Sequence, residues 1–326
     1  MGEKKIYKFA PYIVFLFFSI CIFLKPFGNA DELWNYNFAR GIANGLKPYA
    51  DISMIQTPLS AYLSSLFLIV FGKGLLSYRI VGAVLMMVTV STFYCLCVGI
   101  SKNKTLAFVS TSFVFAMHFY LWMYNYNYLT ILLVLLTMIL FQKDLTNGKL
   151  IAFIFGLLPL IKQSTGAILL AGFYIICVIE IFIEKKTKKD ICLNCLIAIL
   201  PTLLYVLYLF LSGTFADFWE YAVLGIGQFS HRTSYFTLMF SNPFMFVIAL
   251  IPWLLYGMAI YDFFKNGYDG KKIKCYIISL ASMSIAYPLC DTYHFCSALI
   301  PAIPILFMTL KFTDIKRNSA IACNLI

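Results

Sequence analysis

Apolar segments close to the length of a membrane helix recur along the whole chain, and this recurrence most constrains the fold. Crossing a hydrocarbon core of about 30 Å takes about 20 apolar residues in a helix. Period-2 alternation with regularly spaced turns, which marks a membrane β-barrel, is not seen. We therefore predict an all-α polytopic membrane protein with ten to eleven transmembrane helices in one domain, residues 1–326. The eleven segments are 9–24, 58–71, 77–99, 105–122, 128–141, 150–161, 167–183, 191–211, 243–261, 275–290 and 295–311.

Composition and charge agree with this class. The chain is 62% hydrophobic and 12% charged, whereas soluble domains are about half apolar and a quarter charged. The net charge of +11 comes from Lys and Arg in short loops, as orientation signals do. We expect membrane lipids as partners and no nucleic acid. No phosphate loop, serine-hydrolase elbow or zinc-protease motif occurs, and no metal ligands are predicted.

The distribution of Lys and Arg predicts the topology. If all eleven segments crossed the membrane with the N-terminus inside, the basic stretches 185–189 and 265–274 would lie outside, against the positive-inside rule. If the short segment 58–71 is re-entrant or interfacial, the basic stretches lie on the cytoplasmic side, as the rule requires. A break inside 77–99 would also place them there. We predict a plasma-membrane protein with ten full crossings and both termini cytoplasmic.

This topology gathers the polar interruptions of the apolar pattern on the outer face. Ionisable groups beside hydrocarbon are costly and point to function by default. Lys and Arg are standard phosphate-binding residues, so we expect a lipid-phosphate substrate there. The outer-face residues are Asp31, Glu32, Asp51, Gln56, Asn125, Asn127, Lys162, Gln163, His231, Arg232, Asp291 and His294.

The first outer loop predicts an amphipathic helix, DELWNYNFARGIANG, which begins at Asp31 and stops at Gly45. Neighbouring helical residues point about 100° apart, so only one of Asp31 and Glu32 is expected to face a cavity. The other is expected to cap the helix or face solvent.

Structural interpretations stay open beside the functional ones. Asp31 is also a suitable helix N-cap, and Lys162 could snorkel from a helix end to water. Arg232 could be a solvated loop charge, and His294 could form a structural pair with Asp291. Asn125 and Asn127 fit a role as turn caps.

Several spaced elements of the chain match one known pattern. In the first loop and the helices that follow it they are Asp31-Glu32, Ala39-Arg40, Gly45, Pro48-Tyr49, Asp51, Gln56-Thr57-Pro58-Leu59, Phe71-Gly72 and Arg79. Later elements are LIKQSTG at 160–166 and YPLCDTYHFCSALIP at 287–301. Together they resemble the GT-C superfamily of membrane glycosyltransferases. The branch they resemble holds the protein O-mannosyltransferases and the lipid A aminoarabinose transferases.

The resemblance implies an enzyme of the cell envelope that transfers a hexosyl or pentosyl group from a polyprenyl-phosphate donor. The acceptor is a hydroxyl of a lipid, glycan or protein on the outer face, and the anomeric carbon is inverted. Asp31 is then the general base and Glu32 its supporting neighbour. The implied donor phosphate and sugar contacts are Lys162, Gln163, His294, Asp291, Gln56 and Arg232, with loop support from Asp51, Tyr49 and Asn127. A divalent cation is left open as a cofactor.

Two departures from the family pattern keep alternatives open. Several members carry a donor-binding Lys where this chain has Gln56. Well-studied relatives are longer and have a C-terminal extramembrane domain, which is not expected here. The alternatives are a secondary transporter or lipid-linked sugar translocase, and a catalytically inactive, truncated member of the same fold.

Overall fold

The computed structural model describes residues 3–25, 30–121, 124–143, 148–229 and 233–310, whose regular structure is helical. The α-helices are α1 (Glu3–Ile20), α2 (Ala30–Ala43), α3 (Leu59–Phe71), α4 (Leu75–Ser101), α5 (Lys104–Leu121), α6 (Tyr126–Gln142), α7 (Gly148–Ile161), α8 (Gln163–Phe182), α9 (Lys188–Leu211), α10 (Phe215–Phe218), α11 (Tyr235–Met239), α12 (Pro243–Asn266), α13 (Gly270–Ser282), α14 (Thr292–Leu299) and α15 (Pro304–Thr309). Short 3₁₀ or π turns are η1 (Cys21–Leu24), η2 (Trp219–Leu224), η3 (Gly225–Phe229) and η4 (Met283–Ala286). The all-α prediction is confirmed for these residues.

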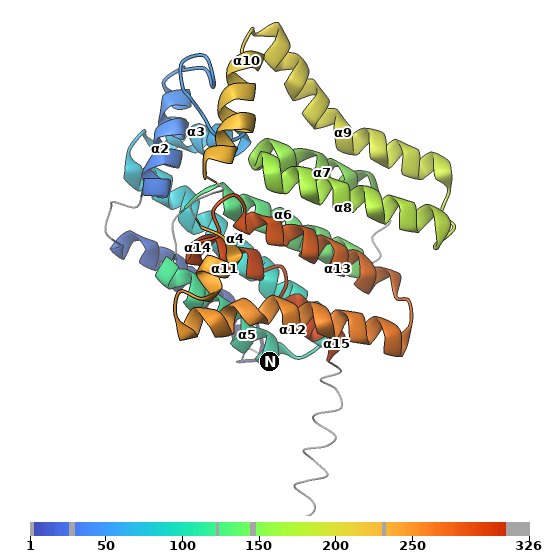
Figure 1. Ribbon diagram of the computed structural model, residues 1–326. Helices are drawn as coiled ribbons and strands as arrows, with labels where there is room; N and C mark the ends of the chain where they lie inside the picture. The colour runs from blue at the N-terminus through green and yellow to red at the C-terminus, as the bar shows by residue number, and fades with distance from the viewer. Residues whose placement is uncertain (1–2, 26–29, 122–123, 144–147, 230–232, 311–326) are drawn as a thin grey trace, which may run out of the picture.

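The long helices lie roughly side by side, and the short helices α2, α10, α11 and α14 gather at one end of them (Figure 1). Helix α6 lies inside this bundle, where Ile131, Leu135 and Met138 are completely buried. The loops that join α8 to α9 and α12 to α13 lie at the opposite end (Figure 1). The bundle therefore has two chemically distinct ends, one built from short helices and one from Lys-rich connections.

Each of the eleven apolar segments contains a helix. In the part of the chain that the structure describes, five helices are long and apolar enough to cross a membrane: Leu75–Ser101, Gln163–Phe182, Lys188–Leu211, Pro243–Asn266 and Thr292–Thr309. The shorter apolar helices are Pro11–Leu24, Leu59–Phe71, Tyr126–Gln142 and Gly148–Ile161. Helix α3, predicted as a partial segment, has 13 residues, or about 20 Å at 1.5 Å per residue. Length thus supports five crossings, and the count of ten to eleven remains a prediction.

The outer surfaces of α9 and α12 support a membrane location. On α9, Leu196 and Leu203 are 65% and 54% exposed, and on α12, Trp253 and Leu254 are 67% and 63% exposed. Soluble monomers rarely expose contiguous apolar patches of this kind. A hydrocarbon environment would cover both faces without cost.

The amphipathic helix of the first loop is present as α2. Tyr36, Phe38 and Ala39 form its buried apolar side, as the pattern predicts. The chain leaves the helix through Gly45, whose φ of +90° is strained for residues with a Cβ. Because α2 begins at Ala30, Asp31 lies inside the first turn rather than at the N-cap position.

Helices α7 and α8 form a hairpin with only Lys162 between them. Lys162 has an extended backbone, with φ −145° and ψ 105°, which reverses the chain. A Cβ at Gly166 would lie 2.2 Å from backbone atoms of Leu158 and Pro159. Glycine therefore permits the close approach of the two helices, and this approach fixes Lys162 at the tip.

Candidate functional site

A cavity of about 270 Å³ lies where α2, the loop before α3, the α7–α8 hairpin, η3 and the start of α14 meet. Five of the residues predicted for the site line it: Asp31, Gln56, Lys162, Gln163 and His294. They come from positions far apart in the sequence, and the fold brings them together. Of the elements that line it, α2 and α14 belong to the group of short helices at one end of the bundle (Figure 1).

Asp31 is half-buried in the first turn of α2. Burial raises the pKa of its carboxyl above the usual value, His294 and Lys162 act in the opposite direction, and Asp291 adds to the increase. The positive end of the α2 dipole favours the ionised form. Asp31 is therefore a carboxylate whose basicity is raised by its surroundings.

Lys162 is the buried cation of the cavity, with 3% of its surface exposed. Its Nζ donates hydrogen bonds to Asn127 Oδ1 at 3.2 Å and to the Ile285 carbonyl at 2.7 Å, and lies 5.5 Å from the Tyr126 ring centre. Burial lowers the pKa of Lys162 to about 7, while Asp291 and Asp31 oppose this decrease. The ammonium is therefore held rigidly and titrates near neutral pH.

Gln163 joins three segments around the cavity. Its Nε2 donates to the carbonyls of Ile55 at 2.8 Å and Ala222 at 2.7 Å, and its Oε1 accepts from the Thr57 N–H at 3.2 Å. Both amide protons are thus engaged. Gln163 positions the walls of the cavity instead of offering a donor to a ligand.

Gln56 is also held by hydrogen bonds within the protein. Its side-chain Nε2 donates to Asn35 Oδ1 at 2.8 Å, and its backbone carbonyl accepts from the Tyr49 hydroxyl at 2.7 Å. Tyr49 is buried, with φ +69°, and its ring packs on Phe218 at 5.3 Å. These contacts hold the loop between α2 and α3 against the helices that cover it.

Asp291 and His294 form a local pair at the start of α14. Asp291 is the N-cap residue, and its Oδ1 accepts from the His294 N–H at 2.8 Å and contacts His294 Nδ1 at 2.9 Å. Burial raises the pKa of Asp291, but the His294 hydrogen bonds outweigh it, so the pKa lies below the usual range. The pair orients the imidazole, which is 5% exposed and lines the cavity.

Glu32 is directed away from the cavity. Its carboxylate accepts two hydrogen bonds from Arg79, from Nε at 2.8 Å and from NH2 at 2.7 Å. Arg79 also donates to the carbonyls of Lys25 at 2.7 Å and Ile22 at 3.4 Å. Glu32, predicted as a catalytic-site residue beside Asp31, is not among the residues that line the cavity. It anchors the start of α2 to α4 and η1.

The other predicted residues have varied positions. Asn127 is completely buried and holds Lys162, and Asn125 caps α6 by accepting from the Asn127 N–H at 2.9 Å. Asp51 is exposed and accepts from the Lys47 N–H at 2.8 Å, outside the cavity lining. Arg232 and His231 lie outside the described residues.

Three contributions were not predicted from the sequence. Arg79 matches the family pattern, but its pairing with Glu32 was not predicted; an arginine near the start of an apolar helix needs a partner, and this signal could have indicated one. Tyr126, between the two asparagines of WMYNYNYL, lines the cavity beneath Lys162. The carbonyl of Ile285 has no sequence signal, because every residue carries a carbonyl.

The helical bundle and its exposed apolar faces define an α-helical membrane protein with a cavity at one end that is lined by Asp31, Lys162 and His294. No protein-family model, curated protein or solved structure matches the chain. Among the described residues, no group of three or more His, Cys, Asp or Glu side chains is arranged to hold a metal ion.

Proposed function

We propose that this protein transfers a sugar from a polyprenyl-phosphate donor to an acceptor hydroxyl, with Asp31 as the general base. The observation that carries the proposal is that Asp31, Lys162 and His294 line the same cavity of about 270 Å³. A carboxylate of raised basicity and a buried cation are the two groups that such a transfer needs.

In the proposed reaction, the Asp31 carboxylate accepts the proton of the acceptor hydroxyl. The acceptor oxygen forms a bond to the anomeric carbon, and the bond from that carbon to the phosphate oxygen breaks with inversion. The electron pair stays on the leaving lipid phosphate. The positive charge of Lys162 stabilises the developing negative charge.

In this proposal, some residues have roles that differ from those that the family resemblance implies. Gln163 and Gln56 have engaged amides, so they act by positioning. Lys162 supplies the buried charge that Gln56 cannot supply. Glu32 acts through the placement of α2, since its carboxylate is held by Arg79.

We also propose that the cavity faces the outside of the plasma membrane, with both termini in the cytoplasm. The arrangement of the bundle supports this orientation, because the Lys-rich loops lie at the end opposite the short helices (Figure 1). Lys and Arg are concentrated in cytoplasmic loops of membrane proteins.

The test compares Asp31→Asn with Asp51→Asn in cells that lack the native protein. Both substitutions remove one carboxylate from the same loop region, but Asp51 is exposed and outside the cavity lining. Mass spectrometry of envelope glycans and glycoproteins is the assay, with the two variants matched for membrane abundance.

We expect a glycan that disappears without the protein, returns with Asp51→Asn and falls about 100-fold or more with Asp31→Asn, as loss of a general base predicts. Full restoration by Asp31→Asn would show that Asp31 is not the base. Movement of a lipid-linked sugar across the membrane without a new glycosidic bond would favour a transporter.

A further inference from the structure

The candidate active site has an aromatic wall with no role in the reaction proposed above. Trp34 lines the cavity together with Asp31 and Asn35. These residues stand at positions i, i+3 and i+4 of α2, so their side chains share one face of that helix. The indole of Trp34 therefore lies on the same helix face as the carboxylate proposed as the general base.

Trp34 differs from the other aromatic residues of α2 in its exposure. It is 37% exposed, whereas Tyr36 and Phe38 are 8% and 4% exposed. The Phe38 ring packs against the indole, with the ring centres 5.8 Å apart and the planes inclined by 47°. The indole is thus supported by a buried ring and still offers surface to the cavity that it lines.

The polar groups around the indole restrict what a ligand can contact. The Asn35 Nδ2 donates to the Asp31 carbonyl at 2.8 Å, and the Asn35 Oδ1 accepts from Gln56 Nε2 at 2.8 Å. Both ends of this amide are therefore engaged within the protein. A ligand of the cavity then meets the Asp31 carboxylate and the Lys162 ammonium as charged groups, and the Trp34 indole as an apolar surface.

A pyranose ring has the chemistry that complements these surfaces. Its hydroxyl groups form hydrogen bonds at the edge of the ring, and its axial C–H groups make one face apolar. Weakly positive C–H groups are attracted to the negative face of an aromatic ring. The cavity volume of about 270 Å³ lies near the lower end of the usual range for small-molecule sites, which suits a single ring.

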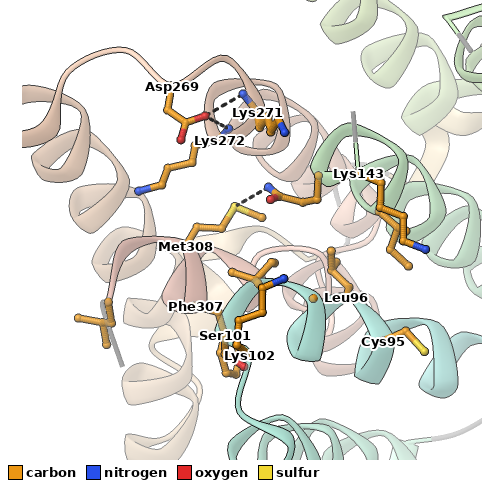
Figure 2. Close-up of a pocket in the computed structure, with 15 residues that line it drawn as sticks. Cys95, Leu96, Ser101, Lys102, Lys143, Asp269, Lys271, Lys272, Phe307 and Met308 are labelled. Carbon is orange, nitrogen blue, oxygen red and sulfur yellow. Dashed lines mark hydrogen bonds between the residues drawn. The ribbon is translucent and has the colours of Figure 1, made fainter. Parts of the chain in front are cut away.

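A second cavity contains the same residue types in an arrangement that does not offer them to a ligand. It measures about 560 Å³ and is enclosed by the C-terminal ends of α4 and α6, the first turn of α13 and the end of α15 (Figure 2). Its carboxylate, Asp269, caps α13 by accepting from two backbone N–H groups at 3.0 and 3.2 Å. Its aromatic residue, Phe307, is 3% exposed. Neither group is presented as Asp31 and Trp34 are.

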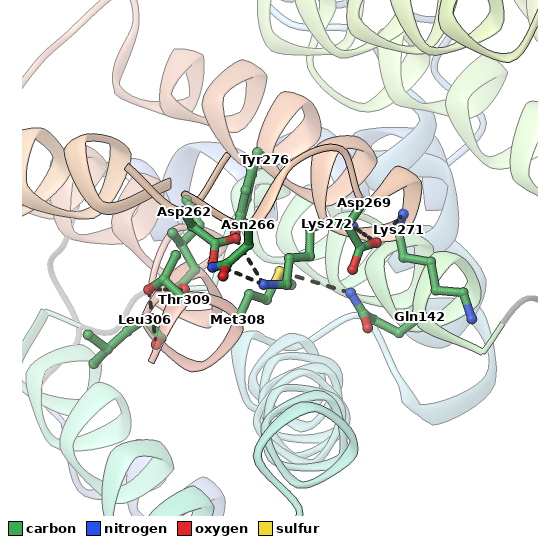
Figure 3. A network of polar contacts seen from close by, with 11 residues as sticks. Gln142, Asp262, Asn266, Asp269, Lys271, Lys272, Tyr276, Leu306, Met308 and Thr309 are labelled. Carbon is green, nitrogen blue, oxygen red and sulfur yellow. Dashed lines mark hydrogen bonds and ion pairs between the residues drawn. The ribbon is translucent and has the colours of Figure 1, made fainter. Parts of the chain in front are cut away.

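A third cavity, of about 450 Å³, lies beside the end of α12 and contains Tyr261 and Asp262. The Asp262 carboxylate is held by the ammonium of Lys272 at 2.9 Å and by the amide of Asn266 at 2.7 Å (Figure 3). The ammonium of Lys265 lies 5.3 Å from the centre of the Tyr261 ring. Both groups are occupied by side chains of the protein, so the cavity beside α2 is the better carbohydrate site of the three.

We propose that Trp34 is the platform on which the transferred sugar stacks, and that this sugar is a pyranose. The inference rests on the proposed function, since it places the donor sugar in the cavity of Asp31. Exposed tryptophans of membrane proteins also anchor helices among lipid headgroups. Such an anchor would affect ligands with and without a sugar equally, whereas a platform acts only on a ligand that carries one.

The experiment measures binding of four pyranose donors and of their common lipid phosphate to the full chain by isothermal titration calorimetry. The donors are geranyl phosphates that carry glucose, galactose, mannose or xylose, and the reference is geranyl phosphate. The site variants are Trp34→Leu, which keeps an apolar side chain, and Trp34→Phe, which keeps a ring. The matched control is Trp253→Leu, because Trp253 is 67% exposed and lies outside the cavity lining. Thermal unfolding midpoints check that the variants fold.

We expect the unchanged protein to bind at least one of the sugar-bearing probes about tenfold or more tightly than geranyl phosphate. Trp34→Leu should remove about five- to tenfold of that gain, because a well-placed aromatic contact contributes about two- to tenfold beyond its buried area. Binding of geranyl phosphate should change less than about twofold. Trp34→Phe should lose about two- to threefold, which keeps the test valid if Trp34→Leu does not fold, and Trp253→Leu should keep the full gain.

Three results would overturn the proposal: no gain from any of the four sugars, a gain unchanged in both Trp34 variants, or equal weakening of the probes with and without a sugar. Asp31→Asn enters the same titration and should keep the gain that depends on Trp34. Because binding is measured without turnover, the platform and the general base can fail separately. Loss of the glycan in Asp31→Asn cells, with no effect of Trp34→Leu on binding, would leave the transferase and remove the platform.

Discussion

Replacing Arg79 with methionine removes the cation that holds Glu32, and the structure allows the cost to be calculated. The side chains of Arg79 and Glu32 are 2% and 3% exposed and lie 2.7 Å apart. Methionine keeps much of the length and apolar volume of the arginine stem but none of its donors. The Glu32 carboxylate and the Lys25 carbonyl would then lose their donors from this side chain.

Breaking a buried ion pair by removing one partner costs about 3–5 kcal/mol, because the other charge stays buried without compensation. For a long chain, about 2 °C of unfolding midpoint corresponds to 1 kcal/mol, so Arg79→Met should lower the midpoint by roughly 6–10 °C. The double variant Glu32→Gln/Arg79→Met removes both charges and should recover more than half of this loss.

Thermal unfolding of the detergent-purified protein, followed by intrinsic fluorescence, measures these shifts. Arg40→Met is the matched control, because Arg40 is an exposed arginine of α2 and surface substitutions cost within about 0.5 kcal/mol. A midpoint for Arg79→Met within 2 °C of the unchanged protein would refute the reasoning, as would a double variant that is less stable than Arg79→Met.

The remaining predictions concern the site and the topology. Because Lys162 has a pKa lowered to about 7, it is charged below that pH and neutral above it, so kcat/KM should fall as pH rises through about 7. Lys162→Arg should move this decrease in kcat/KM to a pH more than one unit higher, since arginine does not titrate near pH 7. A decrease at the same pH in the variant would show that Lys162 is not the group that titrates. Gln163→Ala should lower kcat/KM about tenfold, because it loosens the cavity wall. The control Gln228→Ala, at an exposed position, should change kcat/KM less than twofold. Equal effects of the two substitutions would contradict a positioning role for Gln163. In a cysteine-free background, an impermeant thiol reagent applied to intact cells should label Ser234→Cys but not Lys189→Cys, and the reverse pattern would overturn the proposed orientation.

Much of the local structure could be predicted from the sequence. Each apolar segment contains a helix, and α2 begins at Ala30, one residue from the predicted start. Such features depend on periodicity and on residues such as Gly45, which ends a helix because glycine adopts a positive φ without strain. The breaks after Ser282 and around Pro301 were not predicted, because the apolar pattern runs through them and carries no end signal strong enough to place them.

The sequence indicated five of the polar residues that line the cavity but not the role of each. Asp31 and Glu32 are neighbours of similar chemistry, and helix geometry alone shows only that they point apart. Their roles differ because Arg79, 47 residues from Glu32, is packed where it can hold one of them. The role of Gln163 also depends on contacts distant in sequence, since its three hydrogen-bond partners lie in the α2–α3 loop and η2.

By itself, the sequence determined the class of protein and its helices, because burial in hydrocarbon demands long apolar runs whose backbone polar groups are paired within each helix. Only the tertiary structure decided that Asp31 faces the cavity and that Glu32 holds α2 in place. Those outcomes depend on contacts between residues far apart in the chain, and such contacts have no local pattern from which to read them.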